Sequence, residues 1–391
     1  MSDFITREHR NDGLLTIEAA GSLDANSAPA LMQTFNETWG DTDTELLLDM
    51  NALGYISSAG LRVLVSIQKK LGDKFKVINA APAVYDVFTV TGIDDIIHVE
   101  KRLRDISVEG CPVIGQGATG TVYRIGPETI AKVYKPGVEP VDIREESARS
   151  KEAFKRGIPT AITFDIVKCG DCYATVFELI NATTVAEAVN AAPEQVDFYA
   201  SLLAKMVREA HAIDMSGVAL PSCKDQWREW VQNLDAYYTK TEIDKAIAYV
   251  DAIPECPTFV HNDIHTKNVM LLDNECIMID MGDICYGHPL FDLCGIFNAQ
   301  VDSENNFFCG IDEPLRKPFW NRFIRDYFST DDETYLGERL KEINFAHQFR
   351  LGFCLPTMVK GASQELIDSF IEKGKTRVLP YIDDMTGKVG F

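Results

Sequence analysis

The sequence predicts two domains: an N-terminal α/β domain and a larger α+β domain built from two lobes. The length of 391 residues exceeds what a single hydrophobic core usually organises. Strand and helix patterns alternate through about residue 105. A strand-rich block and then a longer helix-rich block fill the remainder. We therefore assign α/β structure to residues 1–105 and α+β structure to residues 106–391, with lobes at about 106–186 and 187–391.

In the N-terminal domain we expect strands and helices in alternation. The expected strands are 14–23, 45–50, 75–79 and 96–100, and the expected helices are 27–40, 58–71 and 81–92. Helices of this length between strands predict a sheet with helical cover. The charged, glycine-containing segment 101–110 breaks this pattern, so we place the joint between the domains near residue 106.

The second domain opens with strands and continues with helices. Strand-like segments occupy 121–126, 129–135, 162–168 and 173–180, and helical patterns follow from about residue 187, for example at 196–214 and 340–353. Cys169 and Cys172 flank a Gly-Asp pair that is typical of a two-residue hairpin turn. We favour this hairpin over a metal or redox role, because one CxxC supplies only half of a usual zinc site.

Charge and hydropathy argue against several classes of protein. The formal charge of 38 − 59 = −21 opposes nucleic-acid binding, because phosphates would be repelled from most of the surface. It is compatible with a cationic substrate, but a solvated acidic surface is the preferred explanation. No apolar run is long enough to span a membrane, and the polar start MSDFITREHR does not resemble a signal peptide. We expect a cytoplasmic protein whose ten cysteines are reduced.

A glycine-rich segment followed by a lysine is the first candidate site. Gly115, Gly117 and Gly120 form a G-x-G-x-x-G-x-V pattern that ends at Val122. Glycines permit positive φ and let backbone NH groups approach phosphate oxygens, both in dinucleotide folds and in kinase loops. A dinucleotide fold needs a long helix after the glycines, whereas here a second strand-like stretch follows and contains Lys132. This order predicts a glycine loop over nucleotide phosphates, with Lys132 neutralising their charge.

A carboxylate on a helix normally aligns such a lysine. Glu146, in the helix-like segment 144–157, is our preferred partner for Lys132, and Glu145 is the alternative. Either glutamate could instead belong to a solvated helix face.

The segment 261–283, HNDIHTKNVMLLDNECIMIDMGD, carries the strongest chemical pattern. Asp263 and Asn268 have the D-x-x-x-x-N spacing of a phosphotransfer loop, and Asp280 follows a short strand. We expect Asp263 to orient the acceptor hydroxyl and accept its proton. Asn268 and Asp280 offer the oxygen ligands that Mg²⁺ prefers. These residues could be ordinary turn formers, but their order behind a glycine loop and a strand lysine favours ATP-dependent phosphoryl transfer.

Two histidines flank the expected catalytic aspartate. A metal site is one explanation for His261 and His265 around Asp263. We prefer a packed, structural role for His261. His265 is expected to shape the loop without a catalytic role.

Residues 261–269 and 279–293 resemble the aminoglycoside phosphotransferase and choline kinase branch of the protein kinase-like superfamily. The shared features are a histidine two residues after the catalytic aspartate and a Gly-x-Pro-x-x-Asp-Leu after the metal aspartate. The resemblance covers about 111–360 and implies a two-lobed kinase-like fold that uses ATP and Mg²⁺. It also implies that Asp292 is a buried structural aspartate that braces the catalytic loop.

Phe177, Glu178, Leu179 and Ile180 resemble the adenine-binding hinge of the same branch, in which backbone groups contact the base. The sequence departs from protein kinases, however, since no HRD arginine precedes Asp263 and no activation segment is evident afterwards. These departures favour a small-molecule hydroxyl as the phosphate acceptor. The helical region after residue 300 would build the acceptor pocket.

Residues 55–64, YISSAGLRVL, and GSLD at 21–24 resemble the STAS domains of anti-sigma-factor antagonists. The resemblance implies a βα sandwich that regulates the chain or binds a partner, such as an anti-sigma-type kinase or another STAS-binding protein. In that group a serine at the start of this helix is phosphorylated. Ser58 is the matching position, although Ser57 replaces the usual preceding aspartate. A helix N-terminus can accommodate phosphate, but Ser58 could equally be an N-cap.

Three hypotheses of function remain. In the first, the chain phosphorylates a small molecule and the STAS-like module regulates it or recruits a partner. In the second, the chain is a protein serine kinase that acts on a STAS serine such as Ser58. In the third, it binds nucleotide as a scaffold without turnover. The set of Lys132, Asp263, Asn268 and Asp280 argues against the scaffold, and the departures from protein kinases favour the first hypothesis over the second.

Overall fold

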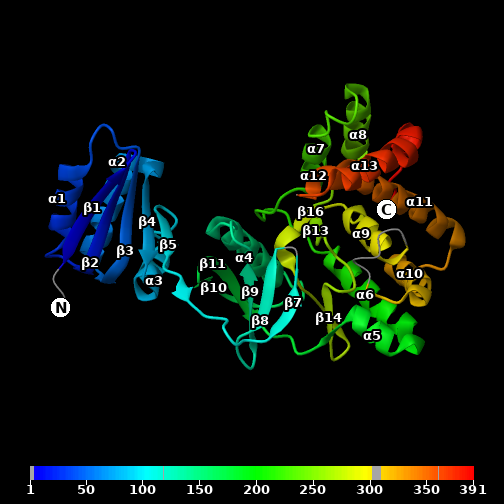
Figure 1. Cartoon of the computed structure of the whole chain (residues 1–391), viewed down its shortest axis with the longest axis horizontal. Helices are drawn as coiled ribbons and strands as arrows, with labels where there is room; N and C mark the ends of the chain where they lie inside the picture. The colour runs from blue at the N-terminus through cyan, green and yellow to red at the C-terminus, as the bar shows by residue number, and fades with distance from the viewer. Residues whose placement is uncertain (1–3, 118, 302–309, 360) are drawn as a thin grey trace. The chain divides into compact units, whose positions relative to one another are not determined.

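The chain divides into two units, Met1–Ser107 and Val108–Phe391 (Figure 1). The computed structural model describes residues 4–117, 119–301, 310–359 and 361–391. Each unit has its own cluster of buried apolar side chains. Over these described ranges, every helix is either too short or too polar to cross a membrane.

The first unit is a five-stranded sheet with helices packed on it. In chain order its elements are β1 (Ile5–Asn11), β2 (Leu14–Leu23), α1 (Ala28–Thr38), β3 (Glu45–Ile56), α2 (Ser58–Leu71), β4 (Phe75–Ala80), α3 (Pro82–Thr91) and β5 (His98–Lys101); the short strand β6 (Arg104–Asp105) follows and is not part of this sheet. The strand order is β1-β2-β3-β4-β5. β1 is antiparallel to β2, and β2 through β5 are parallel to one another. Parallel strands joined by helices bury a continuous apolar layer, which here includes Leu48, Val77 and Phe88.

β1 is absent from the strands that the sequence predicts. Its sequence, ITREHRN, is polar, and most of its side chains are exposed. A charged edge strand lacks the apolar alternation on which such predictions depend, although the same charges discourage pairing with another chain. The prediction was therefore incomplete at this edge.

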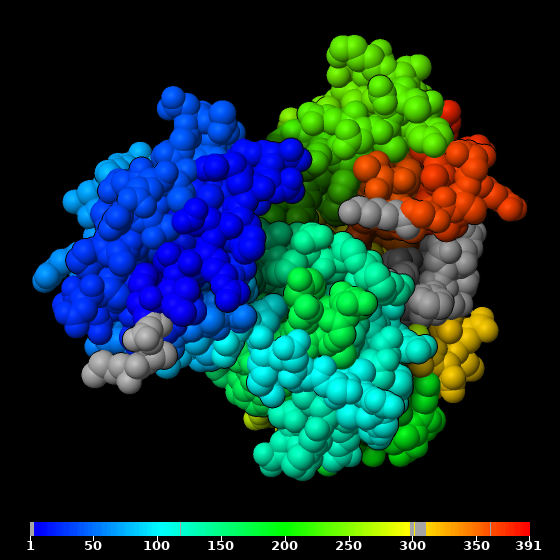
Figure 2. Space-filling view, turned by 60° about the vertical axis from the view of Figure 1, so that its left-hand side comes forward, coloured from blue at the N-terminus to red at the C-terminus, as the bar shows by residue number. Residues whose placement is uncertain are grey.

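The first lobe of the second unit is an antiparallel sheet with one long helix. Its elements are β7 (Val113–Gln116), β8 (Gly120–Arg124), β9 (Thr129–Tyr134), α4 (Pro140–Lys155), β10 (Thr163–Cys169) and β11 (Cys172–Glu178). The strands lie in the order β10-β11-β9-β8-β7. Figure 2 shows their cyan, teal and green atoms gathered on one surface. Cys169 pairs with Cys172 across the turn, and Gly170 has φ of 60°, so this CxxC is a hairpin.

The second lobe is mainly helical. Its helices are α5 (Val185–Ala191), α6 (Val196–Ala210), α7 (Cys223–Gln232), α8 (Lys240–Ala252), α9 (Leu290–Gln300), α10 (Glu313–Phe328), α11 (Glu333–Phe349), α12 (Leu355–Met358), α13 (Gln364–Lys373) and α14 (Ile382–Met385). Short antiparallel pairings join β12 (Thr183–Thr184), β14 (Val269–Leu272) and β15 (Glu275–Met278), and join β13 (Thr258–Val260) to β16 (Cys285–Gly287). A π-helical turn, Arg350–Cys354, follows α11. The buried ring of Trp227 stacks on Phe349 at 5.5 Å between centroids, in the core of this lobe.

The expectation that all cysteines are reduced is wrong for one pair. Cys223 and Cys285 form a disulfide that joins the start of α7 to β16. The two residues are 62 positions apart, and no spacing pattern in the sequence connects them. The fold brings them together because β16 and α7 are packed side by side. The other cysteines that the structure describes are free thiols.

Candidate active site

The glycine loop joins β7 to β8. The NH of Gly117 donates to the carbonyl of Gly120 at 2.9 Å, which closes the turn. A side chain at Gly120 would lie 2.3 Å from the Val133 carbonyl oxygen, so only glycine allows this approach of β8 to β9. Gly115, Gly117 and Gly120 are not among the glycines with positive φ. Glycine is needed at position 120 because there is no room for a side chain, and not because the backbone is left-handed. Ala118 lies outside the described residues.

Lys132 lies in the middle of β9, paired in register with Val122 on β8 and Thr175 on β11. Its Nζ is 3.2 Å from Glu146 Oε1 and 2.8 Å from Asp280 Oδ1. Three residues that are far apart in the sequence therefore meet at one ammonium group.

Glu146 reaches this position from α4, on the side that faces the sheet. The neighbouring Glu145 instead binds Arg149 at 2.8 Å on the outside of the helix. Of the two candidates, Glu146 is thus the residue that the structure places beside Lys132.

The electrostatics of this cluster favour the charged forms. Burial opposes the charge on Lys132, yet Asp280 and Glu146 raise the pKa of its ammonium above the ordinary value. Burial likewise acts against the Asp280 carboxylate, but Lys132 lowers the pKa of Asp280 below its usual value. Lys132, Glu146 and Asp280 therefore form an ion cluster in which each pair favours the charged forms.

Asp263 and Asn268 belong to the loop between β13 and β14. The Asn268 side-chain amide donates to the Asp263 carbonyl at 3.0 Å and to its Oδ2 at 3.2 Å. Asp280 follows β15 and adopts a left-handed backbone with φ of 60°. The hairpin of β14 and β15 therefore brings the Asn268 and Asp280 ends of this segment together, because it joins them by paired strands.

Burial and the neighbouring polar groups have opposite effects on the pKa of Asp263. Burial raises the pKa of the Asp263 carboxyl, while Arg350 and the amide of Asn268 oppose that rise. Burial lowers the pKa of His265 to about 4, so this ring is neutral near pH 7. No sequence pattern pointed to Arg350, which lies in the π-helical turn and donates to the Asn262 carbonyl at 2.9 Å. Arg350 lies 88 positions after Asn262, so no local sequence pattern could connect the two residues.

Asp292 is buried beneath the loop. Its Oδ2 accepts from the NH of His261 at 2.8 Å, and its Oδ1 accepts from the NH of Asn262 at 2.7 Å. His261 itself is fully buried, and its Nε2 lies 3.1 Å from the Ile279 carbonyl oxygen. The loop is thus tied to the strand that leads to Asp280.

Of the expected hinge residues, Phe177 and Glu178 end β11, and Leu179 and Ile180 follow it. The NH groups of Glu178 and Leu179 donate to the carbonyls of Ile162 and Glu128. The NH of Ile180 makes no backbone hydrogen bond within the described part of the chain. Among these residues, Ile180 therefore offers a donor that could contact a nucleotide base.

The residues suited to magnesium are few. Among the residues that the structure describes, no three His, Cys, Asp or Glu side chains gather as a metal-binding cluster. Asn268 and Asp280 supply hard oxygen atoms, which Mg²⁺ prefers, and Mg²⁺ commonly takes only one or two protein ligands together with substrate phosphates. The donor set therefore fits a magnesium ion that arrives with a nucleotide.

In the first unit, Ser57 and Ser58 begin α2. Ser57 is the N-cap, and its hydroxyl accepts from the NH groups of Ala59 and Gly60. Ser58 is the first helical residue and is exposed. The alternative in which Ser58 caps the helix is therefore wrong, because Ser57 occupies that position.

Comparison with known proteins gives the class of each unit. Residues 110–332 match the model of the phosphotransferase enzyme family, which is more than half of the chain. The chain therefore belongs to the phosphotransferase enzyme family. Residues 6–106 match the STAS domain model, so the order is a STAS domain followed by a two-lobed kinase-like domain.

Among curated proteins, the chain is similar to the anti-sigma-F factor antagonist RsfB of Mycobacterium tuberculosis, with 26% identity over 97 residues. These residues are 24% of this chain and 80% of that protein. It is also similar to the anti-sigma-B factor antagonist of Bacillus subtilis, with 27% identity over 96 residues, 24% of this chain and 87% of that protein.

Among solved structures, the chain resembles the streptomycin-ATP-APH(2")-IIa ternary complex, with a TM-score of 0.46 and 16% identity over 68% of this chain and 91% of that one. It also resembles a choline/ethanolamine kinase family protein from Mesorhizobium loti, with a TM-score of 0.47 and 15% identity over 71% of this chain and 92% of that one.

Proposed function

We propose that the second domain is an ATP- and Mg²⁺-dependent phosphotransferase that moves the γ-phosphoryl group of ATP to a hydroxyl of a small molecule. The observation that carries this proposal is the convergence of Glu146 and Asp280 on the Lys132 ammonium group, at 3.2 and 2.8 Å. A buried lysine between two carboxylates, beside a glycine loop, suits the neutralisation of nucleotide phosphates. Membership of the phosphotransferase enzyme family supports the same reaction class.

Each residue in the cluster has a proposed task. Lys132 holds phosphate oxygens, Glu146 keeps the lysine extended towards them, and the loop of Gly115, Gly117 and Gly120 covers them. The backbone at Glu178 and Ile180 contacts the base, and Phe177 and Val122 line the nucleotide site from β11 and β8. Lys132, Val122, Phe177 and Glu178 lie on strands of the first-lobe sheet, whereas Glu146 lies on α4 and Ile180 follows β11.

Asp263 is the proposed base. It accepts the proton of the acceptor hydroxyl as the new oxygen–phosphorus bond forms, and the bond between the γ-phosphorus and the bridging oxygen breaks to release ADP. Asn268 orients the Asp263 carboxylate through its amide and, with Asp280, offers oxygen ligands to magnesium. Mg²⁺, when bound, would offset the negative charge of the phosphates.

The short segment between Asp280 and α9 favours a small-molecule acceptor. The turn Met281–Asp283 and strand β16 lead directly to α9, which begins at Leu290. This fully described stretch leaves no room for an activation segment on which a protein substrate would dock. The acceptor therefore meets the loop in a site that the helices of the second lobe surround.

The experiment that tests the proposal is incubation with labelled ATP and Mg²⁺, with and without a panel of hydroxylated amines. Label on an added alcohol supports the small-molecule reaction. No release of phosphate from ATP, to any acceptor or to water, would contradict it.

One observation favours a second candidate, a signalling kinase that acts on a STAS serine. Ser58 is exposed at the start of α2, and Ser57 already caps the helix, so phosphorylation of Ser58 would not remove the cap. The same incubation separates the two candidates. Label on the chain that is lost in Ser58→Ala supports signalling, possible partners then being anti-sigma-type kinases or other STAS-binding proteins.

A further inference from the structure

Asp292 has a third hydrogen-bond partner besides the two loop amides. His211 caps α6, and its Nε2 lies 3.0 Å from Asp292 Oδ2. The exposed fractions of the His211 and Asp292 side chains are only 4% and 1%. A buried carboxylate is stable only when donors surround it. His211 therefore completes the set of donors that keeps Asp292 beneath the catalytic loop.

The other nitrogen of His211 has a buried partner as well. The hydroxyl of Tyr327, on α10, lies 2.8 Å from His211 Nδ1. Because a carboxylate can only accept, the Nε2–H of His211 donates to Asp292, while Nδ1 pairs with the tyrosine hydroxyl. Burial raises the pKa of Tyr327, so its hydroxyl keeps its proton near neutral pH. The two hydrogen bonds fix the orientation of the ring.

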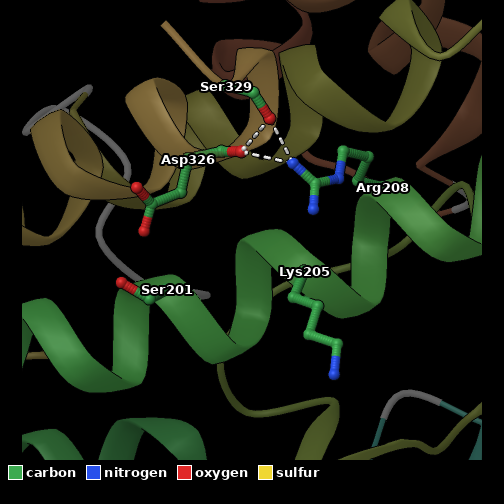
Figure 3. A pocket seen from close by; sticks show the side chains of 5 residues that line it. All are labelled: Ser201, Lys205, Arg208, Asp326 and Ser329. Carbon is green, nitrogen blue, oxygen red and sulfur yellow. Dashed lines mark hydrogen bonds between the residues drawn. The ribbon is translucent and has the colours of Figure 1, made fainter. Parts of the chain in front are cut away.

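Hydrogen bonds join the end of α10 that carries Tyr327 to α6 (Figure 3). Arg208, one turn before His211, donates from Nη1 to the Asp326 carbonyl at 3.0 Å and to the Ser329 hydroxyl. These two contacts lie on either side of Tyr327 in the sequence. They hold the last turn of α10 in place against α6, and so place the tyrosine hydroxyl within reach of His211.

The other end of this chain of contacts is a strained piece of backbone. Asn262, immediately before Asp263, has φ of 67°, a left-handed conformation that is unfavourable for a residue with a side chain. Its NH is held by Asp292 and its carbonyl by Arg350. Such a conformation persists only while its surroundings hold it. Movement of the Asp292 carboxylate would let Asn262 relax and would displace Asp263.

We propose that His211 and Tyr327 are positioning residues of the candidate active site, which hold Asp263 in its reactive place through Asp292 and the backbone of Asn262. Both residues are buried, with whole-residue exposed fractions of 7% for His211 and 8% for Tyr327. The inference rests on the proposed function for its kinetic consequence, but its structural part concerns only the hydrogen bonds of the loop. The end of α10 is thereby coupled to the catalytic loop.

The direct test is hydrogen–deuterium exchange at the amides of His261 and Asn262, which donate to Asp292. Tyr327→Phe removes only the hydroxyl and keeps the ring, which packs against Phe323. We expect exchange at these two amides to become about tenfold faster in Tyr327→Phe, and faster still in His211→Gln, since a buried hydrogen bond is lost. Tyr335→Phe is the matched control, because this neighbouring tyrosine lies on α11, outside the chain of contacts, and exchange should stay within about twofold.

Kinetics supply the second readout. In Tyr327→Phe we expect kcat to fall by about five- to tenfold while KM for ATP stays within about twofold, because the Lys132 cluster is untouched. Unchanged exchange at His261 and Asn262 would overturn the inference, as would equally faster exchange throughout the second unit, which would mean general destabilisation. Wild-type protein without any ATP turnover would overturn the proposed function instead, and the exchange measurement would still decide the positioning role.

Discussion

Replacement of Glu146 by glutamine removes one of the two carboxylates around Lys132 and keeps the size of the side chain. The pair spans 3.2 Å, and the exposed fractions of the lysine and glutamate side chains are 14% and 20%. Two unit charges at this distance attract by about 5 kcal/mol at an effective dielectric constant of about 20. Desolvation offsets most of this attraction, so a hydrogen bond to a charged group contributes a net amount of about 1.5–3 kcal/mol.

Loss of the hydrogen bond between Lys132 and the Glu146 carboxylate predicts a decrease in kcat/KM for ATP of about 10- to 150-fold, since about 1.4 kcal/mol corresponds to a factor of ten. The assay follows ADP release in a coupled reaction, with thermal unfolding as a check on folding. Glu145→Gln is the matched control. Glu145 binds Arg149 at the surface with 59% of its side chain exposed, so kcat/KM should change by less than about twofold. Equal losses in both variants, or full activity in Glu146→Gln, would refute the assignment of the ion cluster.

Three further predictions concern stability. Gly120→Ala places a Cβ 2.3 Å from a carbonyl of the next strand, so the second unit should lose about 1–3 kcal/mol of unfolding free energy; an unchanged thermal transition would contradict the packing. Ser57→Ala loses the cap of α2 and should cost the first unit about 1 kcal/mol in urea unfolding, whereas Ser58→Ala should cost less than about 0.5 kcal/mol. Arg10 lowers the pKa of Asp43, so this carboxylate stabilises the folded state above the ordinary carboxyl pKa of about 3.9, and the contribution disappears as the pH falls below that value. The unfolding free energies of the wild type and Asp43→Asn should therefore differ above about pH 4 and converge as the pH falls below that value, and parallel curves would disprove the role of this pair.

Local patterns in the sequence predicted much of the fold. The strand at Leu14–Leu23 and the helix at Ser58–Leu71 have the predicted bounds, because apolar periodicity and a clear helix start define them. β1 was missed because an exposed edge strand shows no such periodicity. Glycine permits both positive φ and close backbone approach, and at Gly120 the structure uses the second, since β8 and β9 come together there.

The candidate site was predictable where short spacings carry the chemistry. The spacing of Asp263 and Asn268 places them on one loop, where the structure joins them by hydrogen bonds. Arg350 and Tyr327 could not be found in this way, since each meets the loop or its support through helix packing far along the chain. The disulfide of Cys223 and Cys285 escaped prediction for the same reason. Tertiary contacts of this kind have no local signature in one sequence.

Removal of the Asp263 carboxylate tests whether this residue is the base of a phosphotransfer reaction. ATP binding and the transfer of labelled phosphate are measured side by side for the wild type and Asp263→Ala. We expect the variant to bind ATP within about threefold of the wild type, because the Lys132 cluster is intact, and transfer to fall by at least about 100-fold. Transfer at the wild-type rate in Asp263→Ala would contradict the assignment of Asp263 as the base.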